Sequence, residues 1–427
     1  MTCEVVLMNR QAVAMAADSA VTISGPDYLK TYNSVDKLFP LIKDQPVGVM
    51  IYNNAELMGT PWETLISMYR DQARGKSFDT VDGYARDFIG FLSGNPDLFS
   101  QEHQDREFCK HIAVVMSIIA QDFDYQLAQF QQAQAGKLSD HISAIFEFVV
   151  DQLHRDYNSN LNGSPRGELA CFPQGTAEQL QRRYNGPIND IVESLIASLK
   201  SEFSGLTLSQ ATRAQLNEIA VFSVIKDAFF EHYTGVVFAG FGRRESFPAV
   251  RSYLTSTVIM GTLKHRQDRS ANISADSGPV IQPFAQDRMI RTFLTGMDQS
   301  LRMFMFGETL RLSRHLVSDV VGRAPGLSDD QRAQLFSDYS QQNLGTALQA
   351  FFGAIDQFQY ITHTGPILRA ISSLPKKELG ETAASLVKLN SFQQKVMNSI
   401  ETVGGPISLA TITRNEGLVM GKERAEL

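Results

Sequence analysis

Cysteine, tryptophan and long apolar runs are all scarce in this chain of 427 residues. It contains three cysteines, Cys3, Cys109 and Cys171, and one tryptophan. An odd, widely scattered set of cysteines fits neither a disulfide framework nor a zinc site with paired ligands. We therefore expect a reduced, cytoplasmic protein.

The chain also lacks the hydrophobic segments that send proteins to or across membranes. Its first residues, MTCEVVLMNR, place Glu4 inside the apolar run and Arg10 after it. A signal peptide has basic residues first and then a longer apolar stretch. The best apolar run elsewhere, residues 112–120, is far shorter than the roughly 20 residues of a membrane helix. We expect neither export nor a membrane span.

Basic residues are not in excess either, because 39 Lys and Arg stand against 46 Asp and Glu, for a formal charge of −7. Nucleic-acid binding is typical of a clustered basic surface. The short basic patch Lys264-His265-Arg266 is offset by Asp268, and we expect a solvated loop there. The turn-rich stretch 158–175 has no Lys-Ser or Lys-Thr after its last glycine, which excludes a P-loop.

What the chain does have is apolar content, 43% of its residues, enough for one large core or two ordinary ones. Two short apolar runs, residues 3–8 and 12–17, are joined by Asn9-Arg10-Gln11 and predict a β-hairpin. A third strand is predicted over residues 47–52, and a helix over about residues 55–74.

Helical periodicity dominates residues 80–233 and returns at residues 286–316, 329–352 and 375–398. Strands are predicted at residues 236–241 and 253–263, followed by a polar linker over residues 264–279. A final hairpin is predicted from residues 407–413 and 418–420. This order predicts an α+β protein whose helices cover antiparallel sheets and whose first and last hairpins come together.

Thr2 directly follows the initiator methionine, which is normally trimmed before so small a residue. Trimming would leave a hydroxyl and a free α-amine on one residue, so that nucleophile and general base form a unit. That combination points to the hydrolysis of amide bonds.

Taken together, these segments resemble the proteasome β-subunits and HslV-type proteases of the N-terminal nucleophile hydrolase superfamily. The resemblance rests on the first hairpin, on Asp18-Ser19 and Lys37-Leu38, on VGVMIYNNAEL from residue 47 and on VGGPISLATI from residue 403. In that family a mature Thr opens the first strand, an Asp and a small residue end the second, and a Lys follows a short loop. The resemblance implies a four-layer αββα sandwich.

The resemblance also implies roles for the site residues. Thr2 would attack through its hydroxyl while its own α-amine accepts the proton. Lys37 would lie beside that hydroxyl and favour the deprotonated form of both Thr2 groups, and Asp18, next to Ser19, would orient Lys37. A backbone N–H at Asn53 or Asn54 would stabilise the oxyanion. The substrate would be a peptide or related amide, with no metal or organic cofactor.

The chain departs from the family pattern in three ways. The family's Asp and Ser before the final Gly-Gly are missing, and Glu401 and Thr402 are their possible substitutes. The family's Ser-Gly near the nucleophile has only Ser277-Gly278 as a candidate. The chain is also much longer than the family core. We assign residues 1–80, 234–285 and 364–427 to a discontinuous core, and residues 81–233 and 286–363 to two helical insertions.

Several alternatives stay open. Cys3 would become the nucleophile after further trimming, although it lies one residue too close to Asp18. Asp18 and Lys37 would otherwise form an ordinary surface ion pair. The protein would then be a catalytically inactive scaffold that binds partners through its insertions, or, with Thr2 active, a small-molecule amidase or acylase. His103, Cys109 and His111 match no standard zinc spacing. We expect homo-oligomers, because the proteins of the resembled family form rings.

Overall fold

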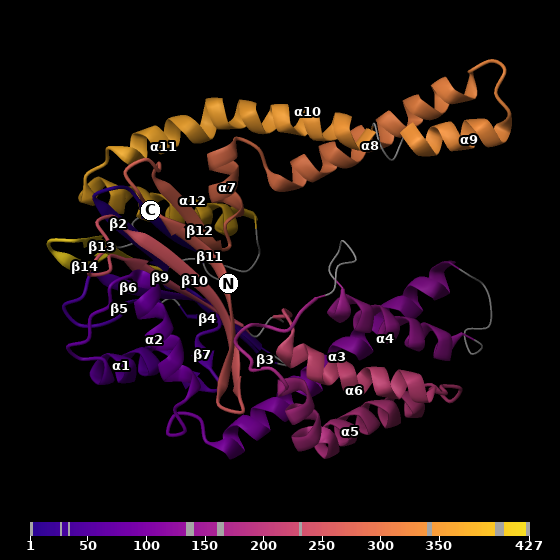
Figure 1. Ribbon diagram of the computed structural model, residues 1–427, viewed down its shortest axis with the longest axis horizontal. Coiled ribbons are helices and arrows are strands. Elements are labelled where there is room, and N and C mark those ends of the chain that lie inside the picture. The colour runs from indigo at the N-terminus through magenta and orange to yellow at the C-terminus, as the bar shows by residue number, and fades with distance from the viewer. Residues whose placement is uncertain are drawn as a thin grey trace.

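The computed structural model describes residues 3–25, 28–32, 35–133, 141–159, 166–229, 233–339, 344–397 and 405–423. Over these residues the protein combines antiparallel sheets with many helices (Figure 1). The expected α+β class is therefore confirmed at this level.

The first sheet brings the two ends of the chain together. Its strand order is β12 (Val280–Ala285), β1 (Cys3–Met8), β2 (Ala12–Asp18), β13 (Ile407–Thr413) and β14 (Gly417–Glu423). All neighbours are antiparallel, and β2 pairs with β13 from Asp18 opposite Ile407 to Ala12 opposite Thr413. Both predicted hairpins and their association are confirmed.

The second sheet has the order β11 (Thr262–Asn272), β10 (Ala249–Ile259), β9 (Thr234–Gly240), β6 (Val47–Asn53) and β5 (Leu38–Pro40). Here the sequence prediction fails at one edge, because β11 occupies most of the predicted linker and Lys264 is buried rather than solvated. The Lys264 ammonium donates to the carbonyls of Ser223 and Ala228, at 2.7 and 2.6 Å. These backbone acceptors compensate the burial of the charged group.

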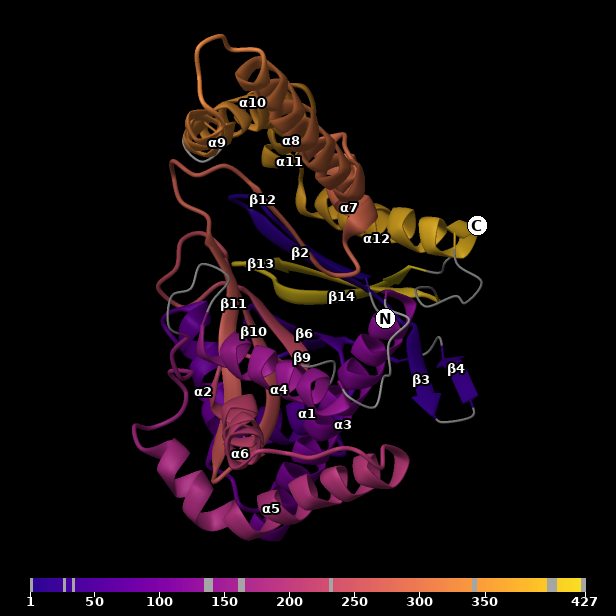
Figure 2. The same cartoon turned by 90° about the vertical axis from the view of Figure 1, so that its right-hand side faces the viewer.

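The two sheets face each other and carry helices on their outer sides (Figure 2). Between them lies a core that includes Val6, Met15, Met50 and Val237. On the outer face of the first sheet, α12 (Lys376–Met397) packs against the side chains of β1 and β2 that point away from the second sheet. On the second sheet, α1 (Trp62–Gln72) and α2 (Val81–Ser93) bury a separate apolar cluster.

The helix predicted from residue 55 begins later than expected. Two short strands, β7 (Glu56–Leu57) and β8 (Thr60–Pro61), form a small hairpin before α1. Met58 and Gly59 form its turn with φ of 51° and 77°, a left-handed conformation that a helix excludes. Another small hairpin, β3 (Val21–Gly25) with β4 (Tyr28–Tyr32), follows β2.

Four helices between α2 and β9 form a bundle with its own core: α3 (Gln101–Ala133), α4 (Ile142–Asn158), α5 (Thr176–Glu202) and α6 (Gln210–Ile225). Their buried residues recur at helical spacing, as in Leu180, Tyr184 and Ile188 of α5. The domain boundaries set out above stay a prediction.

A second helical segment forms an arm that extends away from the sheets (Figure 1). After α7 (Arg288–Thr295) it comprises α8 (Gln299–Gly322), α9 (Asp329–Asp338) and α10 (Leu344–Gln359), and it returns through η3 (Tyr360–Thr364) and α11 (Gly365–Ser372). Its own buried cluster is small, with only Leu344, Leu348 and Phe352 buried in it. Among the described residues, no helix is long and apolar enough to cross a membrane.

Candidate active site

Asp18 and Lys37 form a buried ion pair between the two sheets. Asp18 ends β2 of the first sheet, and Lys37 directly precedes β5 of the second. The Lys37 ammonium lies 3.0 Å from Asp18 Oδ1, and the two side chains are 4% and 1% exposed. Lys37 also donates to the Ala20 carbonyl at 2.5 Å. A surface ion pair, the less specific alternative, is therefore the wrong description of these residues.

The same carboxylate oxygen holds the start of the first strand. The Cys3 amide donates to Asp18 Oδ1 at 3.0 Å, so this atom accepts from both Cys3 and Lys37. Thr2, the predicted nucleophile, lies outside the described residues. It is nevertheless the residue bonded to the Cys3 nitrogen.

Of the other predicted site residues, the structure describes Ser19 and Asn53. Ser19 donates to the carbonyl of Pro406 and so joins the end of β2 to the entry into β13. Asn53 ends β6 with a φ of 74°, and its side-chain amide donates to the Tyr233 carbonyl at 2.8 Å. Glu401 and Thr402 lie outside the described residues.

A small cavity connects Lys37 with Asn53. Its lining includes Val35, Lys37 and the end of β6 from Ile51 through Asn53, and it continues to Asn54 and Ala55. The structure thus brings Lys37 and the predicted oxyanion region to one cavity, whereas Ser19 does not line it and donates to Pro406, ahead of β13.

Cys3 is poorly placed to be the nucleophile itself. Its side chain belongs to the cluster under α12 rather than to the space between the sheets. Burial, followed by the nearby charges of Asp18 and Glu4, raises the pKa of its thiol well above the usual range. A thiol that stays protonated is a weak nucleophile.

Glu4 is a potential site residue that the sequence prediction missed. It lies on the face of β1 opposite Cys3 and is fully buried, and neither carboxylate oxygen has a hydrogen-bond partner among the described residues. Burial raises its pKa strongly, with a further rise from Asp18, while Lys37 lowers it. The signal was available, since Glu4 is the one charged residue in an otherwise apolar strand.

Asp287 was missed for a different reason. Cys3 pairs with Ala285 at the end of β12, so the residues that follow Ala285 come close to the start of β1. The Asp287 carboxylate contributes to the raised pKa of Cys3 and accepts from Arg291 Nε at 2.6 Å. The predicted candidate Ser277-Gly278 lies at the other end of β1, in a hollow with Asn9 and Arg10.

Metal ligation finds no support in the part of the chain that the structure describes. No group of three or more His, Cys, Asp or Glu residues there is arranged to hold a metal ion. His103 lies 3.9 Å from a Glu107 carboxylate oxygen, and His111 Nε2 lies 3.1 Å from the Ser223 hydroxyl.

Comparison with known proteins gives only remote likenesses. No protein-family model matches the chain, and no curated protein matches its sequence. Among solved structures, an Anbu (Gly-1) mutant from Hyphomicrobium sp. strain MC1 is 10% identical, covering 99% of this chain and 87% of its own, with a TM-score of 0.29. Anbu (ancestral beta-subunit) from Yersinia bercovieri is 9% identical, covering 98% and 86%, with a TM-score of 0.26.

These likenesses correct the family expected from the sequence. Both structures are of Anbu, a proteasome-like family distinct from the proteasome β-subunits and from HslV. Our expectation that the chain is of the proteasome β-subunit or HslV type is therefore wrong. At such low TM-scores the superpositions carry no argument about this protein's fold or activity, which must rest on its own geometry.

We expect Lys37→Met to destabilise the protein by about 3 to 5 kcal/mol, because it leaves the Asp18 carboxylate buried without its cation. The double variant Asp18→Asn/Lys37→Met removes both charges and should recover part of that loss. Urea unfolding of the three proteins measures the difference. If Lys37→Met lowers the free energy of unfolding by less than about 1 kcal/mol, the pair behaves like an exposed one, and that result would contradict the buried geometry.

We expect Glu4 to make the protein less stable as pH rises. Because its pKa is raised in the folded state, the folded protein binds the proton more tightly, and stability falls between the ordinary pKa of a glutamate and the raised value. Glu4→Gln should remove this dependence and be more stable than the parent at neutral pH. Unfolding measured across pH tests this, with exposed Glu63→Gln as the control; parallel pH profiles for parent and Glu4→Gln would refute it.

Proposed function

We propose that this protein is an N-terminal nucleophile hydrolase that cleaves peptide or related amide bonds with Thr2 as nucleophile. The observation that carries the proposal is the shared Asp18 oxygen, which binds both the Cys3 amide and the Lys37 ammonium. It ties the residue that follows Thr2 to a buried cation. The order of helices, sheet, sheet and helices supports the αββα sandwich of this superfamily as part of the proposal.

In the proposed mechanism the Thr2 hydroxyl oxygen attacks the substrate carbonyl carbon and its proton passes to the Thr2 α-amine. The Lys37 ammonium repels a charged α-amine and attracts the developing alkoxide, so both groups become easier to deprotonate. A buried cation acts strongly here because little water screens it. Asp18 holds Lys37 in position through their buried ion pair.

The attack gives a tetrahedral oxyanion, which a backbone N–H at Asn53 or Asn54 would stabilise. Its collapse breaks the C–N bond, and the α-amine returns the proton to the leaving amine. Water then hydrolyses the Thr2 ester by the same route and frees the acid product. The positive φ of Asn53 turns the backbone at the end of β6, beside the cavity that Lys37 lines.

The arm supports a proposal about partners. Most of its large exposed apolar side chains lie along α8, α10 and η3: Leu301, Met303, Phe304, Phe306, Leu312, Leu316, Val320, Phe351, Phe358, Tyr360 and Ile361, with Leu335 on α9. Several recur at intervals of three or four residues on α8, which gives one face of a helix. We propose that this face packs against the arm of a second copy, because identical faces related by a twofold axis are self-complementary.

Thr2 is tested by intact mass and N-terminal sequencing before and after treatment with a Thr-directed epoxyketone. We expect a chain that begins at Thr2 and gains one inhibitor mass, while Thr2→Ala stays unlabelled and Cys3→Ser is labelled like the parent. A chain that retains Met1 and stays unlabelled would refute this mechanism and favour the inactive scaffold. Labelling without cleavage of any peptide would favour a small-molecule amidase or acylase.

Self-association is tested by light scattering of the full chain. Phe304→Asp and Leu312→Asp should shift the protein toward monomer, because each places a charge within the proposed apolar contact. Tyr125→Asp, at a residue equally exposed on α3, is the matched control and should leave the mass unchanged. A parent protein that is monomeric at high concentration would overturn the proposal.

A further inference from the structure

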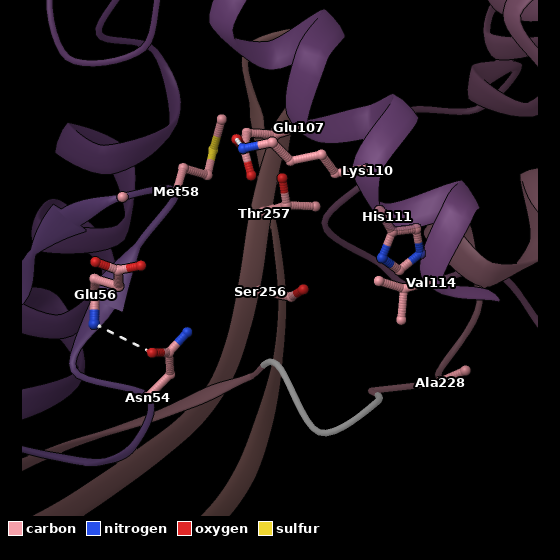
Figure 3. A pocket seen from close by; sticks show the side chains of 11 residues that line it. Asn54, Glu56, Met58, Glu107, Lys110, His111, Val114, Ala228, Ser256 and Thr257 are labelled. Atoms are coloured by element: carbon pink, nitrogen blue, oxygen red, sulfur yellow. Dashed lines mark hydrogen bonds and ion pairs between the residues drawn. The ribbon is translucent and has the colours of Figure 1, made fainter. Parts of the chain in front are cut away.

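A second, larger pocket of about 270 Å³ lies where the helical bundle meets the sheets (Figure 3). One wall is the β7–β8 hairpin, with Glu56 and Met58. The facing wall is α3, with Glu107, Lys110 and His111, and Thr257 of β10 lies between them. The bundle therefore supplies one wall of this pocket.

This pocket adjoins the cavity that contains Lys37. Asn54 lines both, and it follows Asn53, where the proposed oxyanion donors lie. An extended substrate whose scissile carbonyl sits beside Asn53 would thus find the pocket within reach of a neighbouring side chain.

The charges of the pocket leave one carboxylate uncompensated. Lys110 donates to Glu107 Oε1 at 2.6 Å, so these two groups offset each other. The Glu56 carboxylate is exposed to solvent and has no ion pair among the described residues. Figure 3 shows it on the hairpin side, across the pocket from the helix. A ligand with one positive charge would be complementary to it.

The rest of the lining fits a ligand with an apolar stem. Thr257 is only 8% exposed, and its hydroxyl has no hydrogen-bond partner among the described residues. Buried hydroxyls are normally satisfied, so a bound group that reached this oxygen would supply the partner it lacks. Met58 and Val114 offer apolar surface on opposite walls, suited to the methylene stem of a long basic side chain.

We propose that this pocket binds a lysine or arginine side chain of a peptide substrate. The Glu56 carboxylate would pair with the positive charge, and the α3 wall would determine which side chains fit. The inference rests on the proposed function only for cleavage of the bound peptide, which would take place at the site beside Lys37. Binding itself requires only the pocket. A basic residue near the scissile bond would then be preferred over an acidic one.

The test uses the full-length Thr2→Ala protein, so that binding is measured without cleavage. The probes are three fluorescein-labelled peptides of alanine and serine that differ in one central residue: lysine, norleucine or glutamate. Anisotropy should show the lysine peptide binding best. Glu56→Gln should weaken it about tenfold, as expected for the loss of a charged hydrogen-bond partner, and leave the norleucine peptide unchanged.

Two further variants sharpen the result. Glu63→Gln removes an equivalent exposed charge outside the pocket and should change nothing. Thr257→Val replaces the hydroxyl by a methyl group and should weaken the binding of the lysine peptide. Equal binding of all three peptides, or an unchanged affinity in Glu56→Gln, would overturn the proposal. If the protein with an intact Thr2 binds the lysine peptide selectively but cleaves none of the three, the result would count against peptide hydrolysis and leave the pocket assignment standing.

Discussion

The buried contact between Asp18 and Lys37 is the interaction on which the central arrangement depends. It joins the end of β2 in one sheet to the entry of β5 in the other, and through the Cys3 amide it also fixes the first strand. A buried charge without its partner is strongly destabilising, so the two sheets and the start of the chain are constrained together. Folding this way concentrates charge at one place in an apolar interior, which is where ionisable groups acquire unusual chemistry.

Glu4 adds to that concentration. A third ionisable side chain close to the pair, fully buried and without a hydrogen-bond partner in the described part of the chain, carries a cost that packing alone does not explain. In natural proteins such costs gather at functional sites. Asp287, which follows β12 and pairs with Arg291, places a further carboxylate near the start of β1.

The two helical segments differ in what they do with apolar surface. The α3–α6 bundle buries its apolar residues in a core of its own and presents a polar face of α3 to the sheets, which closes one side of a pocket. The arm buries few residues and exposes many large ones. Monomeric proteins rarely leave such extended apolar faces in water. These differences underlie our two proposals, that the bundle takes part in recognition beside the site and that the arm contacts a second copy.

The sequence by itself determined the local elements: both hairpins follow from apolar runs around turn residues, and Asp18 and Lys37 could be named because these segments resemble a known family. It could not predict β11, because polar residues at a sheet edge look like a linker until Lys264 donates to backbone carbonyls in α6 and in the segment that follows it. Nor could it place Asp287 beside Cys3, or α3 opposite the β7–β8 hairpin, since those contacts join segments far apart in the chain. Strand order and helix docking, decided by burial of the whole chain, brought them together.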